Sequence, residues 1–118
     1  MTDKATTLYG IANCDTVKKT RKFLDALGVE YFFHDYKKAG LESDIAATLI
    51  AAVPLESLIN KRGTTWRKLT PEQQNNLSLD SAAELIMANP SVVRRPIIRH
   101  SKGWIVGYDE AQLQALAP

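Results

Sequence analysis

The sequence is poor in cysteine, and this restricts the ways in which the fold can be held together. Cys14 is the only cysteine among 118 residues. One thiol cannot close an internal disulfide, and it cannot complete a zinc site built from several thiolates. The two histidines, His34 and His100, have no second ligand at metal spacing, so we expect them to be structural or exposed. No metal site is therefore expected, and without a phosphate loop or a Rossmann glycine pattern we expect no bound cofactor.

Long hydrophobic runs and an excess of one charge are also missing. No apolar run approaches the length that spans a bilayer, and the beginning at Met1–Lys4 lacks a signal-peptide pattern, so we expect a cytoplasmic protein without membrane contact. The 15 basic and 13 acidic residues leave a net charge of +2, which is too small to indicate nucleic-acid binding. With 118 residues and 45% hydrophobic content, the chain is predicted to form a single domain, residues 1–118.

The hydrophobic pattern at the start of the chain predicts a βαβ unit. Thr6–Ile11 is typical of a strand, helical spacing begins near Asp15 and ends at Gly28, and Val29–His34 predicts a second strand. Strand, helix and strand in this order favour a right-handed crossover between parallel strands. Cys14 would then lie at the carboxyl end of the first strand, where open α/β sheets bind ligands.

The middle of the chain has mostly helical periodicity. Residues from about 41 to 89 are predicted to form a helical insert, with an apolar stripe that begins at Leu41. Within it, Thr70 and Pro71 followed by Gln73 have the pattern of a capped helix start.

The last third returns to strands. Pro96–Ile98 and Trp104–Val106 flank a turn and predict an antiparallel hairpin, and Asp109 resembles the cap of a terminal helix that ends near Leu116. The predicted order is βαβ, then the helical insert, then ββα. It indicates an α/β fold with a four-stranded mixed sheet, which resembles a thioredoxin-like fold with a helical insertion.

Cys14 is the candidate reactive atom. A free cysteine is often only a small buried hydrophobe, but Asn13, Asp15 and Thr16 are polar and suit a turn and a helix start. The unpaired N–H groups and the dipole of a first helical turn stabilise a thiolate, and the Thr16 hydroxyl can donate to it. Thioredoxin-like redox motifs carry a second cysteine three positions on, where this chain has Val17, so the site is monothiol.

Two cationic segments are candidates to accompany the thiol. Arg94 and Arg95 directly precede Pro96, whose X-Pro bond can be cis, and guanidinium groups bind carboxylates and oxyanions bidentately. Residues 60–68 carry four cations, among them Arg62 beside a flexible glycine. Charge runs are often only solvated surface, and an isolated proline often only begins an edge strand, so these readings stay open beside the functional ones.

Two segments give the chain a resemblance to a known family. The stretches Tyr9–Lys19 and Arg94–Ile98 are similar to those of the YffB branch of the ArsC/Spx family, and the resemblance covers nearly the whole length. It implies a thioredoxin-like fold, Cys14 as the redox nucleophile and a cis Pro96 near the sulfur. It also implies that Arg95 is the oxyanion-binding arginine.

The family's arsenate reductases hold the oxyanion with three arginines around the cysteine. By the resemblance, Arg62 and Arg95 match the first two, whereas the third position falls near Tyr108, which carries no cation. Arg99 is the candidate substitute in space. The missing third arginine weakens the prediction of direct arsenate reduction, and the missing second cysteine excludes the disulfide switch that regulatory Spx members commonly carry.

Our leading hypothesis is a glutathione-dependent thiol–disulfide oxidoreductase, in which Cys14 forms a mixed disulfide that glutathione resolves. The alternatives are an arsenate reductase that uses glutathione and glutaredoxin, and an Spx-like regulatory protein that binds RNA polymerase. We expect a monomer. The candidate catalytic residues are Cys14 and Arg95, and the candidate residues for binding glutathione or substrate are Asn13, Thr16, Arg62, Pro96 and Arg99.

Overall fold

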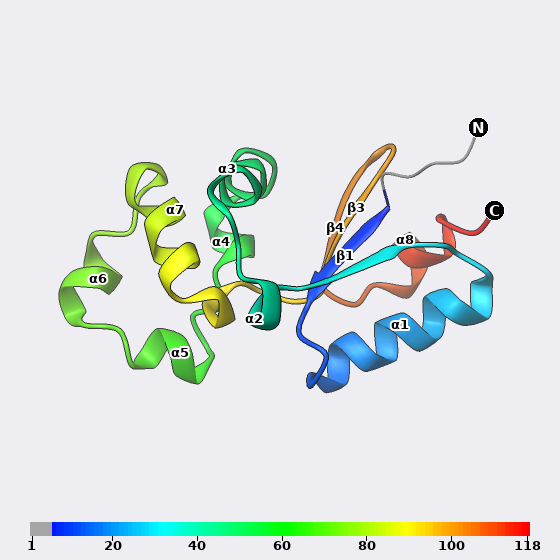
Figure 1. Ribbon diagram of the computed structural model, residues 1–118, viewed down its shortest axis with the longest axis horizontal. Coiled ribbons are helices and arrows are strands. Elements are labelled where there is room, and N and C mark those ends of the chain that lie inside the picture. The colour runs from blue at the N-terminus through cyan, green and yellow to red at the C-terminus, as the bar shows by residue number, and fades with distance from the viewer. Residues whose placement is uncertain (1–5) are drawn as a thin grey trace. The chain divides into compact units, whose positions relative to one another are not determined.

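The computed structural model describes residues 6–118 and shows two compact units. The first unit contains the residues up to Ala39 together with Arg95–Pro118, and the second is Gly40–Arg94. In Figure 1 the first unit carries the blue and cyan segment and the orange and red segment, and the second unit carries the green and yellow helices. The second unit lies where the sequence predicted a helical insert, and the single-domain organisation stays a prediction.

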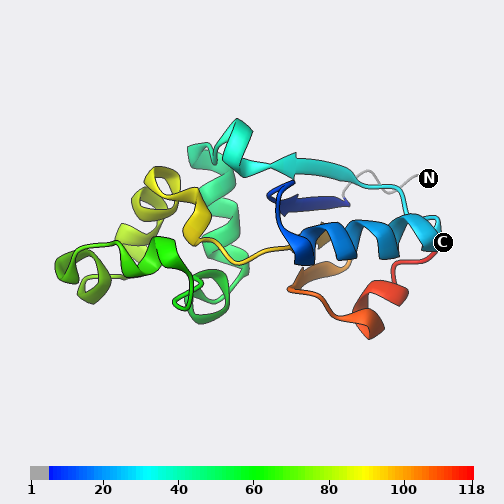
Figure 2. The same cartoon turned by 90° about the horizontal axis from the view of Figure 1, so that it is seen from below.

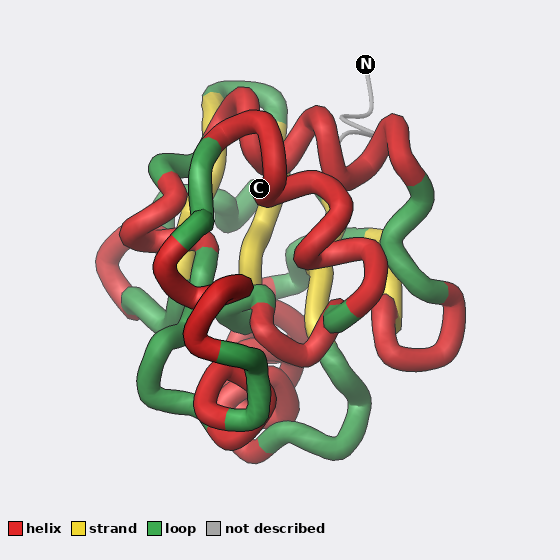
Figure 3. Tube along the Cα trace, turned by 90° about the vertical axis from the view of Figure 1, so that its left-hand side faces the viewer, coloured by secondary structure: helices red, strands yellow, loops and turns green. Residues whose placement is uncertain are grey.

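A mixed four-stranded sheet forms the centre of the first unit. Its order is β2-β1-β3-β4, with β1 and β2 parallel and the other two pairs antiparallel. Figure 3 shows these strands side by side in yellow. This order of strands and crossovers is that of a thioredoxin-like fold, so the predicted fold class is confirmed. The elements of this unit are β1 (Thr7–Gly10), α1 (Asp15–Leu27), β2 (Phe32–Asp35), α2 (Tyr36–Ala39), β3 (Ile97–His100), β4 (Gly103–Val106) and α8 (Glu110–Gln114).

One face of the sheet packs against α1 and α8. Leu8, Ile98 and Ile105 stand opposite one another in β1, β3 and β4, because strand pairing aligns them on one face. They form a buried cluster with side chains of the two helices, and Figure 2 shows α1 running beside the strands with α8 next to it. Burial of each such side chain contributes about 1.5–3 kcal/mol. The helical members of the cluster are Val17, Leu24 and Leu113.

Two glycines allow α1 to pack in this position. A Cβ atom on Gly10 would lie 2.9 Å from Val17 Cγ2, so only glycine allows α1 to approach the end of β1 this closely. At the other end of the helix, Gly28 has φ 77° and donates its N–H to the Asp25 carbonyl at 3.1 Å. This left-handed cap ends the helix where the sequence predicted it.

The second unit is helical, with α3 packed against α7. Thr70 caps α6 through a capping box with Gln73, as the sequence predicted. An isolated bridge between Ile59 and Val93 closes the unit, and Arg94 Nε donates to the Ser57 carbonyl at 2.7 Å. The elements are α3 (Ser43–Ala52), α4 (Leu55–Leu58), α5 (Thr64–Arg67), α6 (Pro71–Asn75), α7 (Leu79–Ala88) and the 3₁₀ helix η1 (Pro90–Val92).

Several element boundaries differ from the prediction. β2 begins at Phe32 rather than Val29, and α8 ends at Gln114 rather than near Leu116. The helix α2 was not predicted, because four residues are too few to show helical periodicity. Among the helices of residues 6–118, none has both the length and the apolar character that crossing a membrane requires.

Candidate active site

Cys14 lies at the start of α1. It is the N-cap residue, with extended backbone (φ −132°, ψ 124°), and its carbonyl accepts the Lys18 N–H at 2.9 Å. The side chain is half-buried and packs against the cluster beneath α1. The sulfur therefore stands beside the first turn of a 13-residue helix, whose dipole favours an anion there. This is the place in the fold that the sequence predicted.

Arg95 provides the cation at the thiol. Its guanidinium hydrogen-bonds to both the Tyr36 hydroxyl and the Cys14 sulfur. Burial lowers the pKa of Arg95, but the interactions with Tyr36 and Cys14 act in the opposite direction and the pKa is raised overall. The guanidinium therefore stays charged, and it lies beside the Cys14 sulfur. The structure thus brings together the two residues that the sequence assigned to catalysis.

Tyr36 is the second partner of Arg95. It is the first residue of α2, and its side chain is completely buried. Burial raises the pKa of Tyr36 to about 12, although the Arg95 guanidinium acts to lower it. The hydroxyl is consequently neutral at physiological pH, and it contacts the guanidinium without cancelling its charge.

Asp35 holds the loop that leads to Cys14. It is the last residue of β2 and pairs with Gly10, the last residue of β1. Its Oδ2 accepts the Ala12 N–H at 3.3 Å, while Oδ1 accepts the N–H groups of Lys37 at 3.0 Å and Lys38 at 3.3 Å. One carboxylate therefore ties the cysteine loop to the start of α2.

The Arg95-Pro96 peptide bond is cis, as the family resemblance implied. Pro96 is buried, and its carbonyl accepts the Gly107 N–H at 2.8 Å. Asn13 and Thr16, the predicted binding residues next to the cysteine, are exposed in the turn and in the first turn of α1. These side chains flank Cys14 in the chain and are open to a ligand.

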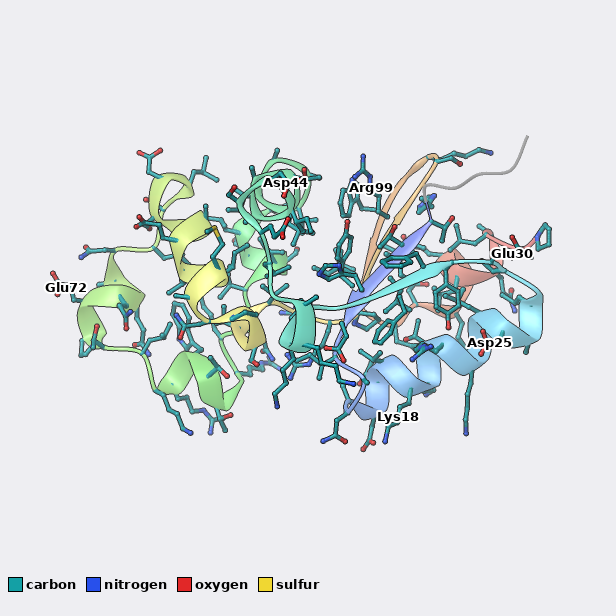
Figure 4. All side chains as sticks on the ribbon, viewed as in Figure 1. Lys18, Asp25, Glu30, Asp44, Glu72 and Arg99 are labelled. Carbon is teal, nitrogen blue, oxygen red and sulfur yellow. The ribbon has the colours of Figure 1, made fainter. Side chains whose placement is uncertain are left out.

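Arg99 lies at the opposite end of the sheet from Cys14. It pairs with Thr7, the first residue of β1, whereas Cys14 comes after the last one, a separation of about 10 Å along the strand. Its guanidinium carbon is 5.6 Å from the Trp104 ring centroid, and Figure 4 shows Arg99 on the side of the sheet away from Lys18 in α1. The expectation that Arg99 substitutes for an arginine at the thiol does not agree with this position.

Arg62 belongs to the second unit, so its role at the thiol stays a prediction. Its side chain is exposed, and its N–H donates to Asn60 Oδ1 at 3.1 Å. Arg67 Nη2 donates to the Arg62 carbonyl at 3.0 Å, which orders the turn before α5.

A cation other than Arg95 lies over Tyr108. By the family resemblance, the third arginine of the arsenate reductases would fall near this residue. Lys19 Nζ is 4.5 Å from the centroid of the Tyr108 ring. Sequence reasoning missed this pair because a residue of α1 and a residue after β4 are remote in the chain. Lys19 also borders a shallow hollow on α1 that begins one residue after Cys14. The hollow is lined by Asp15, Lys18, Lys19, Arg21, Lys22 and Asp25.

Both histidines make local contacts within the fold. The His34 ring lies 5.4 Å from that of Tyr9, and His100 Nδ1 accepts the Lys102 N–H at 3.3 Å. Within residues 6–118, no group of three or more histidine, cysteine, aspartate or glutamate side chains is placed to hold a metal ion.

Comparison with known proteins identifies the family. The model of the ArsC family matches residues 9–116. The chain belongs to the ArsC family. An uncharacterised protein of Haemophilus influenzae is 38% identical over 109 residues, which cover 92% of this chain and 96% of that protein. The global transcriptional regulator Spx of Streptococcus mutans is 28% identical over 114 residues, covering 95% of this chain and 82% of the regulator.

Solved structures show the same ArsC-family architecture. The YffB protein superposes with a TM-score of 0.88 at 36% identity, covering 96% of this chain and 99% of that one. The arsenate reductase (ArsC) related protein of Brucella melitensis has a TM-score of 0.74 at 44% identity, with 94% and 92% of the two chains covered. The resemblance to the YffB branch of the ArsC/Spx family is confirmed.

Proposed function

We propose that this ArsC-family protein is a thiol–disulfide oxidoreductase that uses glutathione as its reductant. The observation that carries the proposal is the contact between its only cysteine, at the start of α1, and the Arg95 guanidinium. A helix N-terminus and a cation on one thiol favour the thiolate, which is the attacking species in disulfide exchange. A monothiol site requires an external thiol to complete the cycle.

The reaction proceeds in two exchanges. The Cys14 thiolate attacks the glutathionyl sulfur of a mixed disulfide G–S–S–R, forms the Cys14–S–S–G bond and releases R–S⁻, which takes up a proton. A second glutathione thiolate then attacks the glutathionyl sulfur, forms glutathione disulfide and releases the Cys14 thiolate. The mixed disulfide is thereby reduced to the thiol R–SH, and the two glutathione moieties leave as glutathione disulfide. Arg95 stabilises the Cys14 sulfur as an anion when it attacks and again when it leaves.

The charges around the cysteine suit glutathione, which carries two carboxylates. Lys18 and Lys19 line the hollow that follows Cys14 on α1, and Asn13 and Thr16 offer exposed polar side chains beside it. We assign these four residues to binding, with the backbone next to Pro96 available to an extended peptide. Arg62 keeps its proposed binding role, and Arg99 does not.

Turnover of a mixed disulfide tests this function. The protein is incubated with a glutathione mixed disulfide of a small thiol, glutathione, glutathione reductase and NADPH, and NADPH oxidation is followed. We expect a rate above that of the protein-free mixture and loss of that excess in Cys14→Ser. A wild-type rate equal to the protein-free rate, or an equal rate for the variant, would refute the proposal.

Arsenate reduction is the second candidate, and the 44% identity to the ArsC-related Brucella protein favours testing it. In that reaction Cys14 would attack an arsenate oxyanion before glutathione and glutaredoxin reduce the adduct. Because Arg99 pairs with the first residue of β1 and lies over Trp104, it does not serve as the third arginine, and we expect little turnover. A robust arsenate-dependent rate that Arg95→Ala abolishes would establish this activity instead.

A regulatory role is the third candidate, because Spx regulators of several bacteria align with 95% of the chain. RNA polymerase is the partner to test. Capture of purified RNA polymerase that is equal for wild type and Cys14→Ser, together with no disulfide turnover, would favour the regulator over the enzyme.

A further inference from the structure

Asp35, the last residue of β2, and Tyr36, the first residue of α2, contact two different parts of the thiol site: the loop before Cys14 and the side chain of Arg95. Asp35 accepts the Ala12 N–H in the loop before Cys14, at 3.3 Å. Tyr36 hydrogen-bonds to Arg95, which in turn hydrogen-bonds to the Cys14 sulfur. The dipeptide is itself placed by the sheet, because β2 is paired in parallel with β1 up to Asp35.

We propose that Asp35 and Tyr36 are positioning residues that hold the Cys14 sulfur and the Arg95 guanidinium in contact with each other. The proposal rests on the proposed function, in which Arg95 acts on the Cys14 thiolate. Asp35 fixes the loop that carries the sulfur, and Tyr36 fixes the cation. Neither residue reacts.

The chemistry of Tyr36 suits this task. Its side chain is fully buried, so the ring has little freedom and its hydroxyl points in a fixed direction. The hydroxyl is neutral, so it orients the guanidinium and leaves the positive charge to the sulfur. A carboxylate in its place would form an ion pair with Arg95 and reduce the charge that Cys14 experiences.

The chemistry of Asp35 suits the other half. Its Oδ1 is fixed by the N–H groups of Lys37 and Lys38 at the start of α2, and its Oδ2 is left to reach Ala12. Both carboxylate oxygens are therefore used, one within α2 and one across to the cysteine loop.

Alkylation of Cys14 by iodoacetamide tests the role of Tyr36 in a double-mutant cycle with Arg95. We expect Tyr36→Phe to slow alkylation about three- to tenfold in the wild-type background, since one hydrogen bond of this kind is lost. In the Arg95→Leu background the same change should have no further effect, because Tyr36 acts through Arg95. Tyr31→Phe is the matched control: it also removes a hydroxyl that is bonded to an arginine, Arg21 Nε at 3.1 Å, and should leave the rate unchanged.

Equal slowing by Tyr36→Phe in both backgrounds, or none in wild type, would overturn the role of Tyr36. Should Tyr36→Phe fail to fold, Arg95→Lys replaces it, because a lysine keeps the charge but cannot reproduce a fork to two partners. An alkylation rate equal to wild type in Arg95→Lys would then overturn the same role.

Asp35→Asn tests the loop. It keeps one carbonyl oxygen and removes the second acceptor, so we expect faster amide hydrogen exchange in the peptide that contains residues 11–14 and slower alkylation in both Arg95 backgrounds. Unchanged exchange and an unchanged rate would overturn the role of Asp35. Alkylation requires no glutathione, so these results separate a failure of the positioning proposal from a failure of the proposed function.

Discussion

Replacement of Arg95 by leucine removes the cation from the thiol and leaves the backbone of α1 unchanged. A hydrogen bond between a charged donor and an anion contributes about 1.5–3 kcal/mol. In thiol–disulfide exchange about half of the charge on a sulfur has changed at the transition state, since the Brønsted coefficient is about 0.4–0.5. The loss expected in the barrier is therefore about 0.7–1.5 kcal/mol, which corresponds to about three- to twelvefold in rate.

The step to measure is the attack of glutathione on the Cys14–glutathione mixed disulfide, which releases the Cys14 thiolate. The Cys14–glutathione adduct is prepared for each variant, mixed with glutathione, quenched at intervals and followed by intact mass. Arg95→Leu should slow the loss of adduct by the factor given above. Arg99→Leu is the matched control, because it removes an arginine from β3 whose guanidinium lies over Trp104 instead of the thiol, and it should react at the wild-type rate. Equal slowing in both variants, or none in Arg95→Leu, would refute the assignment.

Three further predictions concern stability. The pKa of Tyr36 rises from 10.0 to about 12 on folding, so Tyr36 contributes to the free energy of unfolding in full below pH 10 and loses that contribution, about 3 kcal/mol in all, as the pH rises to 12. Urea unfolding at pH 9 and pH 12 should show this loss in wild type and not in Tyr36→Phe. Gly10→Ala should cost about 1–3 kcal/mol, since the new Cβ would lie 2.9 Å from Val17 Cγ2, and an unchanged urea midpoint would contradict this. Thr70→Ala should cost about 1 kcal/mol through loss of the α6 capping box, measured by the same unfolding, and wild-type stability would count against it.

The parts of the fold that the sequence predicted well are those with strong local signals. The start of α1 at Cys14 follows from a polar turn between two apolar patterns, and its end follows from the left-handed Gly28. The strands of the hairpin are short, but each is apolar and the two are separated by a turn, so β3 and β4 were placed within one or two residues. Arg95 was found because it directly precedes the proline that begins this hairpin.

The parts that the sequence did not predict depend on pairing between remote segments. Arg99 was offered as a substitute in space for the third arginine, whose position in the chain falls near Tyr108. The antiparallel register of β3 on β1 instead carries it to the far end of the sheet, and the two-residue period of a strand sets which face it occupies. In the sequence, Asp35 and Tyr36 are a polar and an aromatic residue that directly follow the predicted strand Val29–His34, and this position was the one feature that could have indicated a role at the site. Their bonds to Ala12 and Arg95 required the tertiary structure.

The central claim is that Cys14 is a reactive thiol that exchanges with glutathione. Intact mass of the protein after incubation with oxidised glutathione tests it most directly. Wild type should gain a single glutathione, reversibly with a reducing agent, and Cys14→Ser should gain none. Wild type without an adduct, or an equal adduct on Cys14→Ser, would contradict the account.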